Sequence, residues 1–134
     1  MSTADWARTL AEAHARMHAE HDVERHLLDD LERAVAERAP ASRVHDLLRQ
    51  LVEHTNLHFL SEQLVMRQLA YPGLEAHERE HDELMAQARQ LQQHVEAGEV
   101  EPTLRFIAAM RHWLTSHMAG KDEALSRHLA GGTA

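Results

Sequence analysis

The residues of this chain best suited to chemistry are its histidines, of which there are 13 among 134 residues. Several of them, together with two carboxylates, stand at spacings that favour metal ligation. The seven residues concerned are His21, then His58 and Glu62, then His77 and His81, then His117 and Asp122. Nitrogen and carboxylate ligands in a chain without cysteine favour iron, manganese or zinc over copper–thiolate or iron–sulfur chemistry. The sequence therefore predicts a metal site.

Long helices must position these residues. Only five glycines and three prolines interrupt a sequence rich in Ala, Leu, Glu, Arg and Gln, which is typical of helices. Turn residues divide the chain into four predicted helices. The first runs from Thr3 to Arg38 and stops before Ala39-Pro40, and the second has Ser42 as its N-cap and runs to about Ala70. The third runs from Leu74 to Glu96 with Gly98 as a left-handed C-cap, and the fourth has Pro102 in its first turn and ends near Ala130-Gly131-Gly132.

Apolar residues recur every three or four positions in the first three predicted helices, and the metal-type residues lie on these stripes. The stripe of the second helix reads Val44, Leu48, Leu51, Thr55, His58, Glu62, Val65, Leu69. Such a stripe faces the interior, so its polar residues must find buried partners. Short connections join antiparallel neighbours. We therefore expect an all-α fold, an up-down-up-down antiparallel four-helix bundle with a dinuclear metal site in its core.

The turns also indicate that the metal-type residues share one level of the bundle. His21 and His58 lie at nearly equal distances from the turn at Pro40, and His81 and His117 at nearly equal distances from the turn between them. Histidine and glutamate four residues apart lie on one face of a helix and can chelate a single site. We therefore expect one layer near the middle of the bundle to collect all seven residues.

Five imidazoles and two carboxylates exceed the four ligands with which one zinc ion usually closes. They suit two metal ions bridged by both carboxylates, with three histidines on one ion, two on the other, and an open position on the second. His117 and Asp122 are five residues apart, which in a regular helix separates them by roughly 140°. Gly120 between them favours a π-type bulge that would bring the two side chains together.

Composition limits the other classes of function. The length predicts a single domain over residues 1–134. A formal charge of −8 with neutral histidines disfavours nucleic acid and anionic lipid as partners. No apolar run is long enough to span a membrane, and residues 1–10 lack the apolar core of a signal peptide. We expect a soluble, cytoplasmic protein that binds neither nucleic acid nor membrane; the sequence indicates no protein partner.

Three segments resemble those of the hemerythrin family, in its bacterial branch, and the resemblance extends over about residues 17–129. The segments are His54-Thr-Asn-Leu-His58-Phe59-Leu-Ser-Glu62, Tyr71-Pro72-Gly-Leu-Glu-Ala-His77-Glu-Arg-Glu-His81 and Trp113-Leu-Thr-Ser-His117-Met-Ala-Gly-Lys-Asp122. The resemblance implies two iron ions joined by an oxo or hydroxo bridge, with dioxygen binding at the iron that has fewer histidines. It implies this ligand set: His77, His81 and His117 on one iron, His21 and His58 on the other, with Glu62 and Asp122 bridging.

The first helix offers alternatives to His21 as a ligand, since it also contains His14, His18 and His26. Only His14 and His21 lie on the inward stripe, and only His21 lies at the level of His58. His21 is therefore the expected ligand from this helix.

Glu24 departs from the family's pattern, which commonly has an apolar residue three positions after the first histidine. We expect it to be either a further ligand or proton-transfer group at the open iron, or a solvated residue at the edge of the stripe. His54 is expected either to contact the metal ligands without binding metal itself or to lie on the surface. Phe59 and Trp113 are expected to line the dioxygen pocket; the alternative is that they are ordinary core residues.

The leading interpretation is reversible dioxygen binding as a carrier, store or sensor module. The alternative is a di-iron oxidase or peroxidase that acts on peroxide or a small substrate, which Glu24 favours. A role in metal storage or iron sensing rests on the additional histidines alone.

Overall fold

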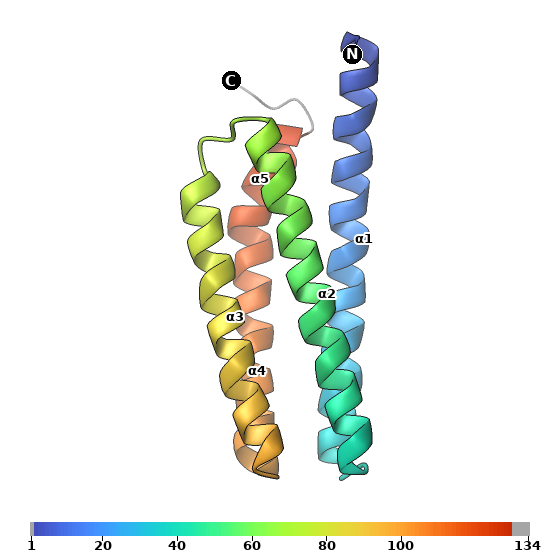
Figure 1. The fold of residues 1–134 in the computed structure, drawn as a ribbon, viewed down its shortest axis with the longest axis vertical. Helices are drawn as coiled ribbons and strands as arrows, with labels where there is room; N and C mark the ends of the chain where they lie inside the picture. Colours follow the sequence, from blue (N-terminus) through green and yellow to red (C-terminus); the bar gives the residue numbers. More distant parts are fainter. Residues whose placement is uncertain (1, 130–134) are drawn as a thin grey trace.

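The computed structural model describes residues 2–129, and within them long antiparallel helices follow one another with short turns (Figure 1). The elements in chain order are α1 (Thr3–Ala36), α2 (Ala41–Gln68), α3 (Leu74–Glu96), α4 (Val100–His117), the π-helix η1 (Met118–Asp122) and α5 (Glu123–Leu129). The last three elements together form the fourth rod of the bundle. The predicted end of this rod, near Ala130-Gly131-Gly132, lies outside the described residues.

The three turns between the rods share one backbone conformation. A residue of left-handed conformation follows the end of each of the first three helices: Arg38 with φ 54°, Ala70 with φ 50° and Gly98 with φ 71°. The amide that follows each of these residues donates to a carbonyl five residues earlier, as from Ala39 to Ala34 at 2.9 Å. This is the Schellman arrangement, which pairs the last free carbonyls of a helix and reverses the chain.

The ends of the first two helices differ from the prediction. Helix α1 ends at Ala36 rather than Arg38, because Arg38 takes the left-handed conformation that closes the helix. Helix α2 begins at Ala41, so the prediction of Ser42 as N-cap is wrong; Pro40 holds that position without a side-chain cap. Helix α2 also ends before Ala70, for the same reason as α1.

We expect Ala70→Gly to raise, and Gly98→Ala to lower, the free energy of unfolding. A residue with a Cβ destabilises the folded protein by roughly 1–2 kcal/mol when its backbone is left-handed. Glycine avoids this cost but loses about 0.5–1 kcal/mol more chain entropy on folding. The expected effects are a gain of up to about 1 kcal/mol at Ala70 and a loss of about 1 kcal/mol at Gly98. Urea unfolding of the two variants beside the unchanged protein measures both, and a loss at Ala70 would contradict the argument.

Each rod packs against two neighbours: α1 contacts α2 and α4, and α3 contacts the same two helices. This arrangement confirms the predicted all-α, up-down-up-down four-helix bundle. The N-terminal turns of α1 extend beyond the turn that joins α2 to α3 (Figure 1). None of the described helices combines the length and apolar character needed to cross a membrane.

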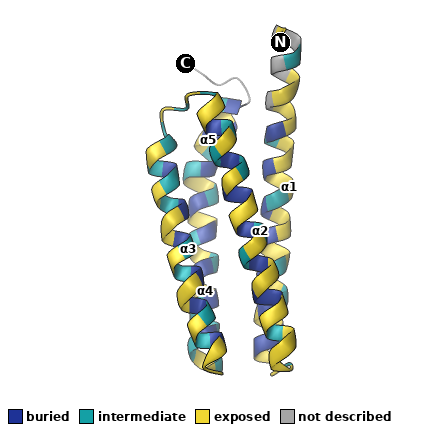
Figure 2. Cartoon of the chain, viewed as in Figure 1, coloured by how far each residue is buried: buried dark blue, intermediate teal, exposed yellow. Residues whose placement is uncertain are grey.

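The interior consists of two apolar clusters separated by a polar layer. The larger cluster lies toward the α1–α2 and α3–α4 turns and contains Leu28, Leu51, Leu84 and other residues. The smaller cluster lies toward the other end and includes Met17, Met66 and Leu125. Along every rod the metal-type residues fall between members of the two clusters, on the buried inner faces that Figure 2 shows in dark blue.

Candidate metal centre

The polar layer brings together all seven residues that sequence spacing selected. We call them the His–carboxylate cluster; each is at most 5% exposed. Its members come from all four rods: His21 from α1, His58 and Glu62 from α2, His77 and His81 from α3, His117 from α4 and Asp122 from η1. Their ligand atoms form two groups of mutually close atoms, each within 4.8 Å, and both groups contain Glu62 and Asp122.

Asp122 lies among three imidazoles. Its Oδ2 is 2.8 Å from Nε2 of His21, while its Oδ1 is 2.8 Å from Nε2 of His77 and 3.1 Å from Nε2 of His117. The two oxygens of one carboxylate therefore face histidines of α1 on one side and of α3 and α4 on the other. A carboxylate in this position is suited to bridging two cations.

Glu62 lies close to Asp122 in the layer and also faces three imidazoles. Its Oε1 is 3.0 Å from Nε2 of His58 and 3.4 Å from Nε2 of His81, and its Oε2 is 3.7 Å from Nε2 of His77. Like Asp122, it lies between histidines of both groups. The division predicted from the residue count, with three histidines on one side and two on the other, is present in the geometry: one group holds His77, His81 and His117, the other His21 and His58.

The π-helix η1 brings Asp122 to the cluster. A regular helix would turn Asp122 away from His117, but the wider turns of Met118–Asp122 set both side chains inward, and both are 2% exposed. The predicted π-type bulge is thereby confirmed, although the reason given for it is not. Gly120 has no left-handed φ, and a Cβ placed there would meet no atom within 4 Å, so the bulge makes no use of glycine.

Many polar atoms of this layer are buried without a hydrogen-bond partner, which is rare in folded proteins and calls for an explanation. A metal ion fits the pattern, because all the unpaired atoms of the cluster but Nδ1 of His77 are nitrogens and oxygens that converge. Within the cluster they are Nε2 of His21, His58, His77, His81 and His117, Nδ1 of His77, both Oε atoms of Glu62 and Oδ1 of Asp122. Nitrogen and oxygen donors of this kind suit iron, manganese or zinc.

Burial and neighbouring charges shift the pKa values within the cluster in opposite directions. Burial lowers the pKa of His58, but close contact with the carboxylate of Glu62 and the charges of other nearby carboxylates outweigh it and raise that pKa to about 10. Burial and the neighbouring histidines lower the pKa of His81 to about 2. A cation that binds His58 must therefore displace a proton, while the imidazole of His81 is already neutral, so metal binding is linked to proton release.

The two carboxylates also differ. Burial, together with the charge of Asp122, raises the pKa of Glu62 to about 8. Burial acts in the same direction on Asp122, but its close contacts with His117, His21 and His77 hold its pKa well below the usual range. The negative charge of the metal-free layer therefore rests mainly on Asp122.

Sequence reasoning missed the residues that hold the histidines from behind. A carboxylate oxygen of Glu20 pairs with Nδ1 of His58, and Oε1 of Glu80 lies 2.9 Å from Nδ1 of His117. Both glutamates directly precede a cluster histidine in the sequence and reach a histidine of the adjacent helix. The repeated Glu-His dipeptide was the available signal.

A third contact from behind involves an amide. Nε2 of Gln63 lies 3.3 Å from Nδ1 of His81. Glu20 and Glu80 accept Nδ1–H of their histidines, which fixes the orientation of a ligating imidazole and raises its basicity, whereas the amide nitrogen of Gln63 can only donate and so orients His81 without raising its basicity. Three of the five cluster histidines thus present Nε2 to the layer.

We expect Glu80→Ala to weaken metal binding by about 10–100-fold, because loss of a carboxylate behind a ligating histidine has effects of that size. Glu83→Ala, at an exposed position of the same helix, is the matched control and should bind metal as the unchanged protein does. Competition with a chromophoric chelator measures both affinities. Equal affinities for the two variants would contradict the role of Glu80.

Aromatic rings cover the cluster on the side of the larger apolar cluster. The ring of Phe59, which is 3% exposed, stacks on His81 at 3.7 Å between centroids, and the half-buried Trp113 stacks on His117 at 4.9 Å. His54 lies outside the cluster, where its Nε2 is 3.0 Å from the backbone oxygen of Glu20. These positions suit Phe59 and Trp113 to excluding water, and His54 to linking α2 to α1.

Glu24 is buried rather than solvated at the edge of its stripe. It is 1% exposed, and its Oε1 is buried without a hydrogen-bond partner. It stands one turn from His21 on α1 and near enough to His58 for its charge to act on that imidazole. Glu24 belongs to neither group of mutually close ligand atoms, so it lies beside the cluster rather than within it.

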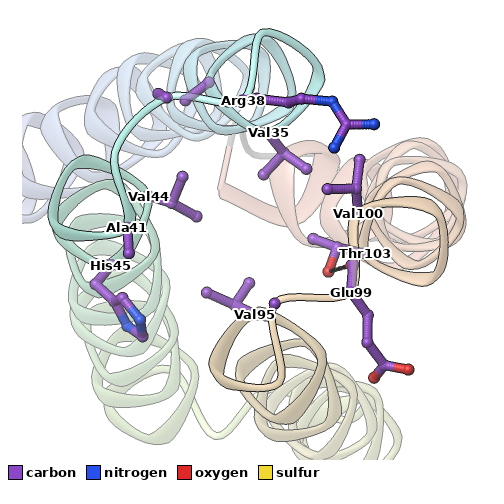
Figure 3. Close-up of a pocket in the computed structure, with 12 residues that line it drawn as sticks. Val35, Arg38, Ala41, Val44, His45, Val95, Glu99, Val100 and Thr103 are labelled. Atoms are coloured by element: carbon purple, nitrogen blue, oxygen red, sulfur yellow. Dashed lines mark hydrogen bonds between the residues drawn. The ribbon is translucent and has the colours of Figure 1, made fainter.

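A separate apolar cavity of about 200 Å³ lies at the far end of the bundle, between the α1–α2 and α3–α4 turns (Figure 3). Val35, Val44, Val95 and Val100 line it, and Arg38 lies at its edge. None of the seven cluster residues borders it. The cavity is therefore separate from the polar layer that holds the cluster.

Fold and site together define the class: a four-helix bundle with a histidine-and-carboxylate metal centre in its core. The family model described as the Hemerythrin HHE cation binding domain matches residues 12–129. The chain belongs to the hemerythrin family.

Curated relatives support this assignment. The chain is 34% identical over 85 residues to a bacteriohemerythrin of Methylococcus capsulatus, and this alignment covers 61% of the chain and 63% of that protein. It is 27% identical over 130 residues to a bacteriohemerythrin of Ralstonia nicotianae, and this alignment covers 97% of the chain and 91% of that relative. The alignment with the first relative thus spans less than two thirds of it. No solved structure gives a significant match.

Proposed function

We propose that this protein holds two iron ions in the His–carboxylate cluster and binds dioxygen reversibly, as a carrier, store or sensor module. His77, His81 and His117 would hold one iron, His21 and His58 the other, and Glu62 and Asp122 would bridge the two with an oxo or hydroxo group. The observation that carries the proposal is the unequal division of five histidines around two shared carboxylates. Fewer protein ligands on one side favour an exogenous ligand there.

The bound iron would supply the electrons for dioxygen binding, and the chain would control the surroundings. Phe59 and Trp113 stack on cluster histidines and keep water from that side of the site. Glu20, Gln63 and Glu80 fix the imidazoles so that Nε2 points into the layer. The smaller histidine group borders a hollow lined by His21 and Asp122, through which a small molecule can approach.

A second candidate function is oxidation or peroxide turnover at the same centre. The observation that favours it is Glu24, a buried carboxyl group with an unpaired oxygen beside the smaller histidine group. An additional anionic oxygen ligand would favour the oxidised iron and compete with dioxygen. The same carboxyl group would be placed to move a proton to or from a bound small molecule.

Anaerobic reduction of the iron-loaded protein, followed by air, tests both candidates. Two irons per chain and an absorption band that disappears under vacuum and returns in air would support reversible binding. Oxidation without a lasting band, together with catalytic loss of added peroxide, would favour the enzyme. Metal content is measured in parallel, and one zinc ion per chain in the isolated protein would overturn both.

A further inference from the structure

Two histidines of α1 outside the His–carboxylate cluster face each other. Nε2 of His14 and Nε2 of His18 lie 3.3 Å apart, and their rings meet edge to face with centroids 4.6 Å apart. His14 is half-buried and His18 exposed. The two nitrogens thus converge on one point at the surface.

The separation of the two nitrogens is the one that a metal ion requires. Zinc–imidazole bonds are about 2.0–2.1 Å long, so two nitrogens at a tetrahedral angle lie about 3.3 Å apart. In the metal-free protein one ring donates a hydrogen bond to the other across this distance, and a bound cation would take the place of the shared proton. Because both residues belong to one rigid helix, the pair is already arranged for chelation.

The pair lies at the mouth of a path to the interior. His18 lines a hollow of about 300 Å³ between α1 and η1, whose wall also includes His21, Asp122 and Glu123. The ring of His18 is 6.3 Å from that of His21. The hollow therefore connects an exposed histidine with two members of the cluster.

We propose that His14 and His18 form an accessory site for a divalent first-row transition-metal ion, from which the ion passes along the hollow to the His–carboxylate cluster. The net charge of −8 attracts cations to the molecule. Glu123, on the wall of the same hollow, offers a carboxylate along the way. The accessory site stands on its own geometry, while the transfer step rests on the proposed function of the cluster.

Zinc titration of the iron-loaded protein by calorimetry tests the accessory site, since the cluster is then occupied. The variants are His14→Gln and His18→Gln, and the matched control is His26→Gln, an exposed histidine of the same helix without a histidine one turn away. Each of the first two should weaken zinc binding by at least about tenfold, the lower bound for loss of a contact to a metal site. His26→Gln should leave it unchanged. Equal zinc affinity in all three variants would overturn the proposal.

Anaerobic uptake of Fe²⁺ by the metal-free protein tests the transfer step. His18→Gln should slow uptake while the final iron content equals that of the His26→Gln control. Equal rates in the two variants would overturn the transfer. If no variant and not even the unchanged protein takes up iron, the proposed function of the cluster fails, whereas zinc binding by His14→Gln, His18→Gln and His26→Gln, compared in the protein as isolated, still decides the accessory site.

Discussion

Asp122→Asn is expected to remove at least one metal ion per chain from the isolated protein. The substitution keeps the size of the side chain but replaces one of the two oxygens with an amide nitrogen, which cannot ligate a cation. Since Oδ1 and Oδ2 face histidines of different groups, only a carboxylate can serve both sides. Loss of a bridge should weaken metal binding beyond the roughly 10–100-fold that outer contacts contribute.

Metal analysis and optical spectroscopy of the purified variant measure this effect. Asp82→Asn, at an exposed position of α3, provides the control, and circular dichroism establishes that both variants are folded. A variant at Asp122 that keeps the metal content of the control would show that this carboxylate is not a bridge. The result would leave the fold untouched but would end the dinuclear interpretation.

The fold was predictable because the chain repeats one strong signal. Residues at three- and four-residue intervals define an inward stripe in each of the first three rods, and nearly equal distances from the turns set the level at which His21 meets His58. The helix ends were less predictable. Arg38 and Ala70 adopt a left-handed conformation that sequence reasoning reserves for glycine, and only Gly98 met that expectation.

The sequence predicted which residues lie together in the candidate site, but not the contacts that surround them. Spacing within one helix determines which residues share a face, and this sufficed to bring together the seven members of the cluster. Contacts such as Glu20 with His58 and Glu80 with His117 join different helices. They depend on how each rod is rotated about its axis and on side-chain rotamers, neither of which a spacing reveals.

The unpaired polar atoms of the cluster indicate a cost that the metal-free protein bears. A buried polar group without a partner costs about 1–3 kcal/mol by protein mutational data, and the layer holds several. The two apolar clusters on either side must offset this cost for the bundle to fold before it is loaded. Metal binding would then stabilise the protein, because a ligand that binds only the folded state raises its free energy of unfolding.

We expect Glu24→Leu to raise the free energy of unfolding of the metal-free protein by roughly 1–4 kcal/mol, since an apolar side chain replaces a buried carboxyl group with an unpaired oxygen. Glu24→Gln keeps the shape and polarity and should bring no such gain. Urea unfolding of the two variants measures the difference. An unchanged stability in Glu24→Leu would show that the carboxyl group has partners in the folded protein.

The same substitution in the iron-loaded protein decides what Glu24 does. If Glu24 contacts the bound metal, Leu at this position removes a favourable interaction, so the stabilisation seen without metal should shrink or reverse on loading. The difference between the two stability changes measures the coupling between Glu24 and the metal. The oxygenated form of Glu24→Leu should then also persist longer in air. An equal gain with and without metal would separate Glu24 from the centre and remove the observation on which the oxidase or peroxidase alternative depends.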